Sequence, residues 1–135
     1  MLRPKQTKFN KYRKIRIKRI ERRQTSLQFG SFGLRTLEGG QISSRQIEAV
    51  RRVITRKLKR TGQLWIRVFP NIPVTKKPVE VRMGKGKGPV DRWVAVVKPG
   101  TIIYEVGEVK ENLAKVALLS GAKKLSMKCN FVKRS

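Results

Sequence analysis

The segment 44–60 is the part of the chain whose structure is most narrowly determined by its residues. Ser43 and Gln46 match the S-x-x-Q capping box that starts many helices, and Gly62 is placed to end this one. At about 100° per residue, the apolar side chains fall in one sector and basic side chains fall opposite. The apolar residues are Ile47, Val50, Ile54 and Leu58, and the basic ones are Arg45, Arg52, Arg56, Lys59 and Arg60. The segment therefore predicts a helix with one face packed on a core and a cationic strip outside.

The cationic strip has two interpretations. An ordinary solvated helix face usually carries charges of both signs, whereas Glu48 is the only acid in this segment. A one-signed strip favours contact with the phosphates of RNA. We expect RNA contact, with a merely solvated face as the alternative.

Short apolar runs separated by turn formers predict strands around this helix. Gly30 and Gly33 interrupt the first run and suggest a bulge. Pro99 and Gly100 suit a type II turn, so the runs on either side of it are expected to pair as a hairpin. The runs are 26–37, 64–69, 79–81, 93–97, 102–106 and 125–131.

A second helix is expected at about 110–123, with Leu113, Val116 and Ala117 facing inward. Within 64–69, Trp65 and Phe69 are expected to pack in the core rather than to stack on RNA bases. The order of elements predicts an α+β fold, with two helices packed on one face of a mostly antiparallel sheet.

The charge balance sets the domain organisation and the class of partner. The 135 residues suggest one domain, and 34 Lys and Arg against 8 Asp and Glu give a net charge of +26. Residues 1–25 are predicted to be a basic N-terminal arm that orders on a polyanion, and 26–135 a single α+β domain. The candidate RNA contacts of the arm are Lys5, Lys8, Lys11, Arg13 and Arg16.

The residue inventory argues against two other classes of protein. The chain has one cysteine and no histidine, which removes the usual zinc sites and the usual near-neutral general base. A nuclease or RNA-modifying enzyme would need a carboxylate cluster, but the acids are scattered. A membrane-surface binder would need a helix with an exposed apolar face, whereas these helices need their apolar faces for the core. No apolar run is long enough to span a bilayer. We expect no catalytic residue, metal or cofactor, and no membrane partner.

A glycine–lysine loop begins at Arg82, with Gly84, Gly86 and Gly88 alternating with Lys85 and Lys87. Glycine permits positive φ and close backbone approach, while the cations suit a phosphate backbone. The spacing matches neither the Walker loop nor the dinucleotide fingerprint. The loop is expected to be the tip of a long connection that contacts RNA, and a solvated turn is the alternative.

Several runs together give the chain a family resemblance along nearly its whole length. It resembles the bacterial-type large-subunit ribosomal protein L-sixteen family. The matching runs are Pro4-Lys5, Thr7-Lys8-Phe9, Phe29 to Leu34, Arg45 to Ala49, Arg51-Arg52, Trp65 to Pro70, Lys77-Pro78 and Val81 to Gly88.

The resemblance implies a structural, non-enzymatic role in the large ribosomal subunit. It implies binding to large-subunit rRNA beside the aminoacyl-tRNA site, tRNA positioning, late subunit assembly, and neighbouring ribosomal proteins as partners. The family's loop reaches toward the peptidyl transferase centre, so Arg82, Lys85 and Lys87 are expected to contact RNA there.

The departures from the family pattern bear on the compartment. Residues 14–25 are rich in Ile, Lys and Arg where relatives have more glycine, and the chain ends soon after Val132. Met1 coincides with the family's own start, so no presequence is expected. The replacements and the short ending suggest a mitochondrial ribosome, with a plastid or a bacterial cytoplasm as alternatives.

Overall fold

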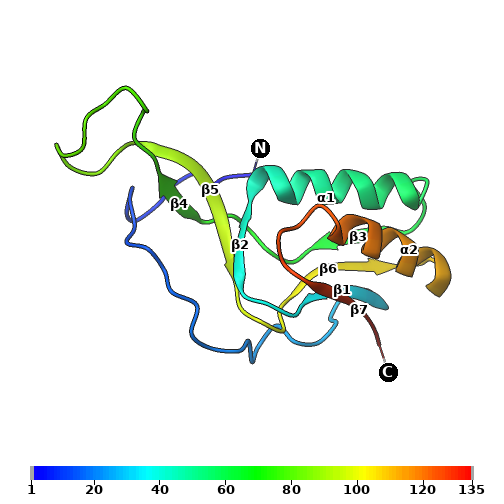
Figure 1. The fold of residues 1–135 in the computed structure, drawn as a ribbon. Helices are drawn as coiled ribbons and strands as arrows, with labels where there is room; N and C mark the ends of the chain where they lie inside the picture. Colours follow the sequence, from blue (N-terminus) through cyan, green and yellow to red (C-terminus); the bar gives the residue numbers. More distant parts are fainter. Residues whose placement is uncertain (1, 135) are drawn as a thin grey trace.

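The computed structural model describes residues 2–134, which form two helices and seven strands (Figure 1). The helices are α1 (Ser44–Lys57) and α2 (Glu111–Ala122). The strands are β1 (Phe32–Thr36), β2 (Gly40–Ser43), β3 (Gln63–Ile66), β4 (Ile72–Thr75), β5 (Val90–Val97), β6 (Ile102–Gly107) and β7 (Cys129–Lys133). The predicted α+β fold is confirmed.

The strands divide between two antiparallel sheets. One has the order β3-β6-β1-β7 and the other the order β2-β5-β4. Both helices lie on one side of the four-stranded sheet (Figure 1). The predicted hairpin between 93–97 and 102–106 is wrong, because β5 and β6 belong to different sheets. The type II turn itself is present: Gly100 has φ +91° and the Thr101 amide donates to the Lys98 carbonyl at 3.2 Å.

Helix α1 starts as its sequence predicts. The Ser43 hydroxyl accepts from the Gln46 amide at 3.2 Å, and the Gln46 side chain accepts from the Ser43 amide at 3.0 Å. The helix ends differently, at Lys57. Lys59 (φ +53°) takes the left-handed position expected of glycine, and the Arg60 amide donates back to the Thr55 carbonyl at 3.2 Å. Gly62 lies beyond this cap, so its predicted capping role is wrong.

The core lies between the helices and the four-stranded sheet. Ile47, Val50 and Ile54 of α1 are fully buried there together with Tyr104, whose hydroxyl donates to the Ile47 carbonyl at 2.8 Å. Helix α2 crosses α1 at Gly121, where an added Cβ would lie 2.9 Å from Ile54 Cγ1. This small residue lets the two helices approach closely, as their packing requires.

The inward face of α2 differs from the prediction. Ala114, Ala117, Leu118 and Gly121 are its buried residues. Ala117 faces inward as expected, but Val116 is 54% exposed and Leu113 lies at the surface.

The strand boundaries also differ from the predicted runs. Residues 79–81 are outside any strand, and Val79 is 95% exposed, whereas β4 forms earlier at 72–75 despite its proline. Strand β4 is an edge strand, which tolerates a residue without an N–H. Phe69 is 47% exposed and is therefore not the core aromatic that we expected. The predicted bulge lies in β1, between Leu34 and Arg35 opposite β6.

The segment 24–30 covers the face of the four-stranded sheet that the helices leave open. The Ile102 amide donates to the Gln24 carbonyl at 2.9 Å, and Leu27 packs over Gly33. Three successive amides, of Gln28, Phe29 and Gly30, donate to the fully buried carboxylate of Glu105 in β6. This attachment joins the N-terminal segment to the folded body.

Candidate nucleic-acid interface

The outer face of α1 carries the predicted cationic strip. Arg45, Arg52, Arg56, Lys59 and Arg60 are all exposed, opposite the buried apolar residues. A shallow depression on this face is lined by Arg51, Arg52, Thr55, Arg56, Lys59 and Arg60. The two faces of α1 are thus as the sequence predicts.

Glu48 partly neutralises the strip at one place. Its carboxylate accepts from the guanidinium of Arg51 at 2.5 Å and from Arg52 Nε at 3.2 Å, and these bonds lower the pKa of Glu48 to about 2. In residues 2–134, no acidic side chain forms an ion pair with Arg56, Lys59 or Arg60. The free positive charge is therefore concentrated at the C-terminal end of α1.

The glycine–lysine loop spans residues 76–89 between β4 and β5 and extends away from the body (Figure 1). Gly84 (φ +107°) and Gly86 (φ +83°) use the conformational freedom that the sequence suggested, and Lys85 between them also has positive φ. A Cβ at Gly84 or Gly86 would meet nothing within 4 Å. These two positions therefore favour glycine because of their positive φ, and not because neighbouring atoms would crowd a side chain.

Gly88 has a different role, at the base of the loop. The Lys76 amide donates to the Pro89 carbonyl at 3.2 Å, which closes the two ends of the loop. A Cβ at Gly88 would lie 2.9 Å from the Lys76 carbonyl oxygen. Close backbone approach, the second use predicted for these glycines, is found at this position.

The loop and the N-terminal arm contact each other. Lys11 Nζ donates to the Lys87 carbonyl at 3.3 Å, and Lys87 Nζ donates to the Tyr12 carbonyl. The Lys87 ammonium therefore holds the arm beside the loop. The side chains of Arg82 and Lys85 are exposed on the same loop.

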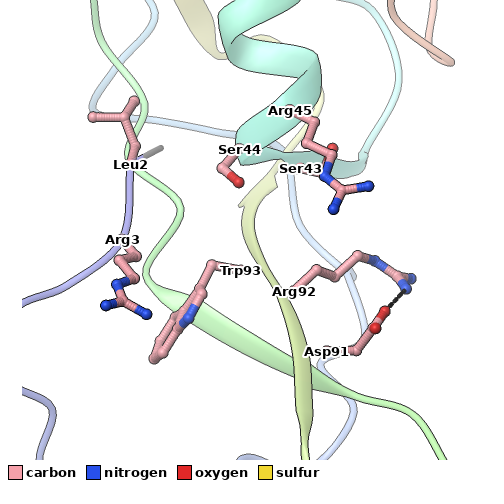
Figure 2. A pocket seen from close by; sticks show the side chains of 8 residues that line it. All are labelled: Leu2, Arg3, Ser43, Ser44, Arg45, Asp91, Arg92 and Trp93. Carbon is pink, nitrogen blue, oxygen red and sulfur yellow. Dashed lines mark hydrogen bonds and ion pairs between the residues drawn. The ribbon is translucent and has the colours of Figure 1, made fainter. Parts of the chain in front are cut away.

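A cleft of about 430 Å³ lies at the N-terminal end of α1 (Figure 2). Arg3 and Trp93 lie on one side of it, and Arg45 and Arg92 on the other. Asp91 accepts from Arg92 Nη1 at 3.3 Å and offsets one of the three positive charges. The cleft brings the start of the arm, the start of α1 and β5 together.

The predicted contact residues thus form separate groups. The arm lies against the loop through Lys11. Arg45 lines the cleft opposite Arg3, whereas the cations at the C-terminal end of α1 form a group of their own. Lys5, Lys8, Arg13 and Arg16 are exposed along the arm.

Sequence reasoning missed Arg3, Arg92 and Trp93. Arg3 is one basic residue among many in the arm. Trp93 begins the apolar run 93–97, which has the pattern of a core strand, and Arg92 directly precedes that run. Only the folding of β5 against the start of α1 places them in one cleft, so no local pattern distinguishes them.

Two further findings concern other classes of site. Within residues 2–134, the structure holds no group of three or more Asp, Glu or Cys side chains placed to bind a metal ion. Neither helix in that range has the length and apolar content needed to cross a bilayer.

Comparison with known proteins decides the family. The model of the ribosomal protein L16p/L10e family matches residues 4–132. The chain belongs to this family. The resemblance found in the sequence is confirmed.

Relatives of similar length support this membership. The chain is 55% identical over 134 residues to the large ribosomal subunit protein uL16 of Mesorhizobium japonicum, covering 99% of this chain and 98% of that protein. It is 56% identical to the protein of that name from Hyphomonas neptunium, covering 99% and 97%. It is 53% identical to that of Psychrobacter arcticus, covering 100% and 98%. The similarity to these relatives therefore extends over the arm, the loop and the residues that line the cleft.

Proposed function

We propose that this chain is a structural constituent of the large ribosomal subunit and binds its rRNA. The observation that carries this proposal is the relationship to large-subunit proteins over nearly the full length of both chains. The exposure of every predicted RNA-contact residue supports it, since a phosphate ligand must reach those charges. The protein is a structural component and not an enzyme.

The proposed position of the chain is beside the aminoacyl-tRNA site, with the loop directed toward the peptidyl transferase centre. Arg82 and Lys85 contact RNA there, while Lys87 holds the arm against the loop and also contributes charge. In this role the protein helps to position tRNA and to complete subunit assembly. The extension of the loop 76–89 away from the body supports this assignment.

The arm and the body act as two RNA-binding parts. Residues 1–25 form the basic arm, and residues 26–135 form the rRNA-binding domain. The first part of the arm holds no helix or strand between residues 2 and 23, which fits a segment that takes its path from the RNA. Large-subunit rRNA, tRNA and neighbouring ribosomal proteins are its proposed partners.

The proposed compartment is a mitochondrial ribosome, on the strength of the residue replacements in 14–25. The relatives named above are bacterial, which suits the bacterial alternative. Fractionation of the source cells into cytoplasm and organelles, followed by detection of the chain in ribosomes of each, separates these compartments.

The test of the proposed function is co-sedimentation with large subunits. The wild-type chain should sediment with large subunits in a sucrose gradient. Its binding to free rRNA should weaken by orders of magnitude between about 50 and 200 mM salt if about six to ten phosphates are contacted. A flat salt titration, or a chain that stays at the top of the gradient, contradicts the proposal.

Loop variants test the finer assignment. Arg82→Ala removes a planar donor fork, and Gly86→Val disfavours the backbone conformation with φ +83° that the loop uses, so both should impair incorporation or slow peptide-bond formation. Neither should unfold the free protein, because the core lies elsewhere and a Cβ at Gly86 would meet nothing within 4 Å. Arg82→Lys should be intermediate. Lys110→Ala, an exposed cation outside the predicted contacts, is the matched control. Full occupancy and full speed with both loop variants would rule out the loop assignment.

A further inference from the structure

Phe29 presents an aromatic ring at the surface of a strongly basic protein. The residue is 57% exposed, although it lies in the segment that covers the four-stranded sheet. Its ring stacks on Trp65, with centroids 6.1 Å apart and planes 21° from parallel. The guanidinium carbon of Arg67 lies 5.9 Å from the centroid of the same ring.

Trp65 and Arg67 contact the Phe29 ring from the side of the four-stranded sheet. Trp65 and Arg67 are two residues apart on an extended segment, and the Arg67 amide continues the ladder by donating to the Ile103 carbonyl at 2.9 Å. Side chains two residues apart on a strand project from the same face. Phe29 therefore lies over both, and its outward side is the exposed one.

The backbone holds this ring in place. The Phe29 amide donates to Glu105 Oε2 at 2.6 Å, and the amides of Gln28 and Gly30 donate to the same buried carboxylate at 3.0 and 2.9 Å. Arg67 Nη1 donates to that carboxylate at 2.9 Å and to the Ser26 carbonyl at 2.8 Å. The exposed ring is thus fixed by a buried ion pair and is ordered before any partner arrives.

A further cation lies beside the segment that carries Phe29. Arg134 donates from Nη2 to the Leu27 carbonyl at 3.3 Å, which places a cation beside the segment. A rigid aromatic ring next to cations is the arrangement on which single-stranded RNA stacks its bases, because every base offers a π face and the cations hold the phosphates. The net charge of +26 favours a polyanion over an apolar protein surface as the occupant.

We propose that Phe29 is a stacking platform for an unpaired nucleobase of large-subunit rRNA, with Trp65 and Arg67 as its support and Arg134 as a phosphate contact. The proposal rests on the proposed rRNA-binding function and adds a base-stacking site to the predicted contacts, which were all cationic side chains and glycine backbone.

Other exposed aromatic rings lack this support and serve as comparisons. Phe9 is also 57% exposed, and Lys8 Nζ lies 5.5 Å from the centroid of its ring, but Tyr12 meets that ring at its edge and no ring is stacked beneath it in residues 2–134. Phe69 is 47% exposed, and among residues 2–134 it has no ring stacked on it. Phe69→Leu is therefore a matched control for an exposed ring without a platform.

The test compares two RNA probes on the full-length chain. One is an oligouridylate carrying 4-thiouridine, and the other is a fully paired duplex with the same number of phosphates. Phe29→Leu should weaken binding of the single strand by about fivefold or more, since stacking on one aromatic ring contributes that much. Duplex binding and the salt dependence should stay unchanged, because the phosphate contacts remain. Phe29→Tyr should keep single-strand binding, and Phe69→Leu should leave both unchanged.

Irradiation of the wild-type complex provides a measurement that needs no variant. The 4-thiouridine should crosslink to the peptide that contains Phe29, as mapped by mass spectrometry. Absence of salt-dependent binding by the wild type to either probe means that the rRNA-binding function itself fails. Salt-dependent binding with equal affinities for wild type and Phe29→Leu, and no crosslink at Phe29, overturns the stacking site alone. If wild type and Phe29→Leu bind RNA equally but Phe29→Leu is not incorporated into subunits, Phe29 contacts a protein. That result also overturns the stacking site.

Discussion

Replacement of Glu105 by glutamine should cost this protein a large part of its stability. The carboxylate is fully buried and accepts four hydrogen bonds. Oε1 accepts from the Gln28 amide at 3.0 Å and from Arg67 Nη1 at 2.9 Å, and Oε2 accepts from the amides of Phe29 and Gly30 at 2.6 and 2.9 Å. Glutamine has one oxygen, so whichever way it turns, its NH₂ group faces two donors.

The magnitude follows from the two hydrogen bonds that are lost. Each bond to a charged acceptor contributes about 1.5–3 kcal/mol, and breaking a buried ion pair by removing one partner costs about 3–5 kcal/mol. We therefore expect the free energy of unfolding to fall by about 3–5 kcal/mol, which is a large share of the roughly 5–15 kcal/mol typical of a domain. Glu108→Gln, at an exposed acid just after β6, should stay within about 0.5 kcal/mol.

Urea denaturation measures this cost, and hydrogen exchange locates it. The amides of Gln28, Phe29 and Gly30 should lose protection in Glu105→Gln, because their acceptor has gone. Arg67→Met combined with Glu105→Gln should cost less than the two single changes added together, since each single change leaves a buried partner unpaired. A loss below about 1 kcal/mol with the three amides still protected would refute the role given to the carboxylate.

Further predictions concern the two faces of α1, the packing at Gly30 and the pH dependence of stability. Ile54→Ala should cost about 2–5 kcal/mol in urea denaturation because the side chain is fully buried, whereas Arg56→Ala should leave stability unchanged and weaken RNA binding; equal destabilisation by both would contradict the two faces of α1. Gly30→Ala should cost about 1–3 kcal/mol, since a Cβ there would lie 2.6 Å from the Val106 carbonyl oxygen, and a near-normal melting temperature would contradict this crowding. Burial raises the pKa of Glu105, but the hydrogen bonds it accepts outweigh burial and hold that pKa below 4.5. Its stabilising contribution is therefore full above pH 4.5 and is lost as pH falls through the lowered folded pKa, and Glu105→Gln should show a smaller acid-induced loss of stability than the wild type.

Local patterns in the sequence determined the elements that depend on interactions between residues close in the chain. The capping box and the 3.6-residue periodicity placed the start and both faces of α1, because hydrogen bonds to the first turn and burial along one side depend on residues close in the chain. The type II turn at Pro99-Gly100 and the positive φ of Gly84 and Gly86 follow for the same reason. The cationic character of the surface, and with it the class of partner, came from charge alone.

Tertiary structure decided what depends on residues far apart. Runs 93–97 and 102–106 have the pattern of a hairpin, but each strand is paired by strands from elsewhere, and only the complete sheets show this. Glu105 looks like an ordinary strand acid, since the amides that bind it come from a segment about 75 positions earlier. Only that folding brings Phe29 onto Trp65 and places Arg3 and Arg45 in the lining of one cleft. Pairing and burial between distant residues leave no periodic signal in the chain, which is why the stacking ring and the cleft had to be found in the structure.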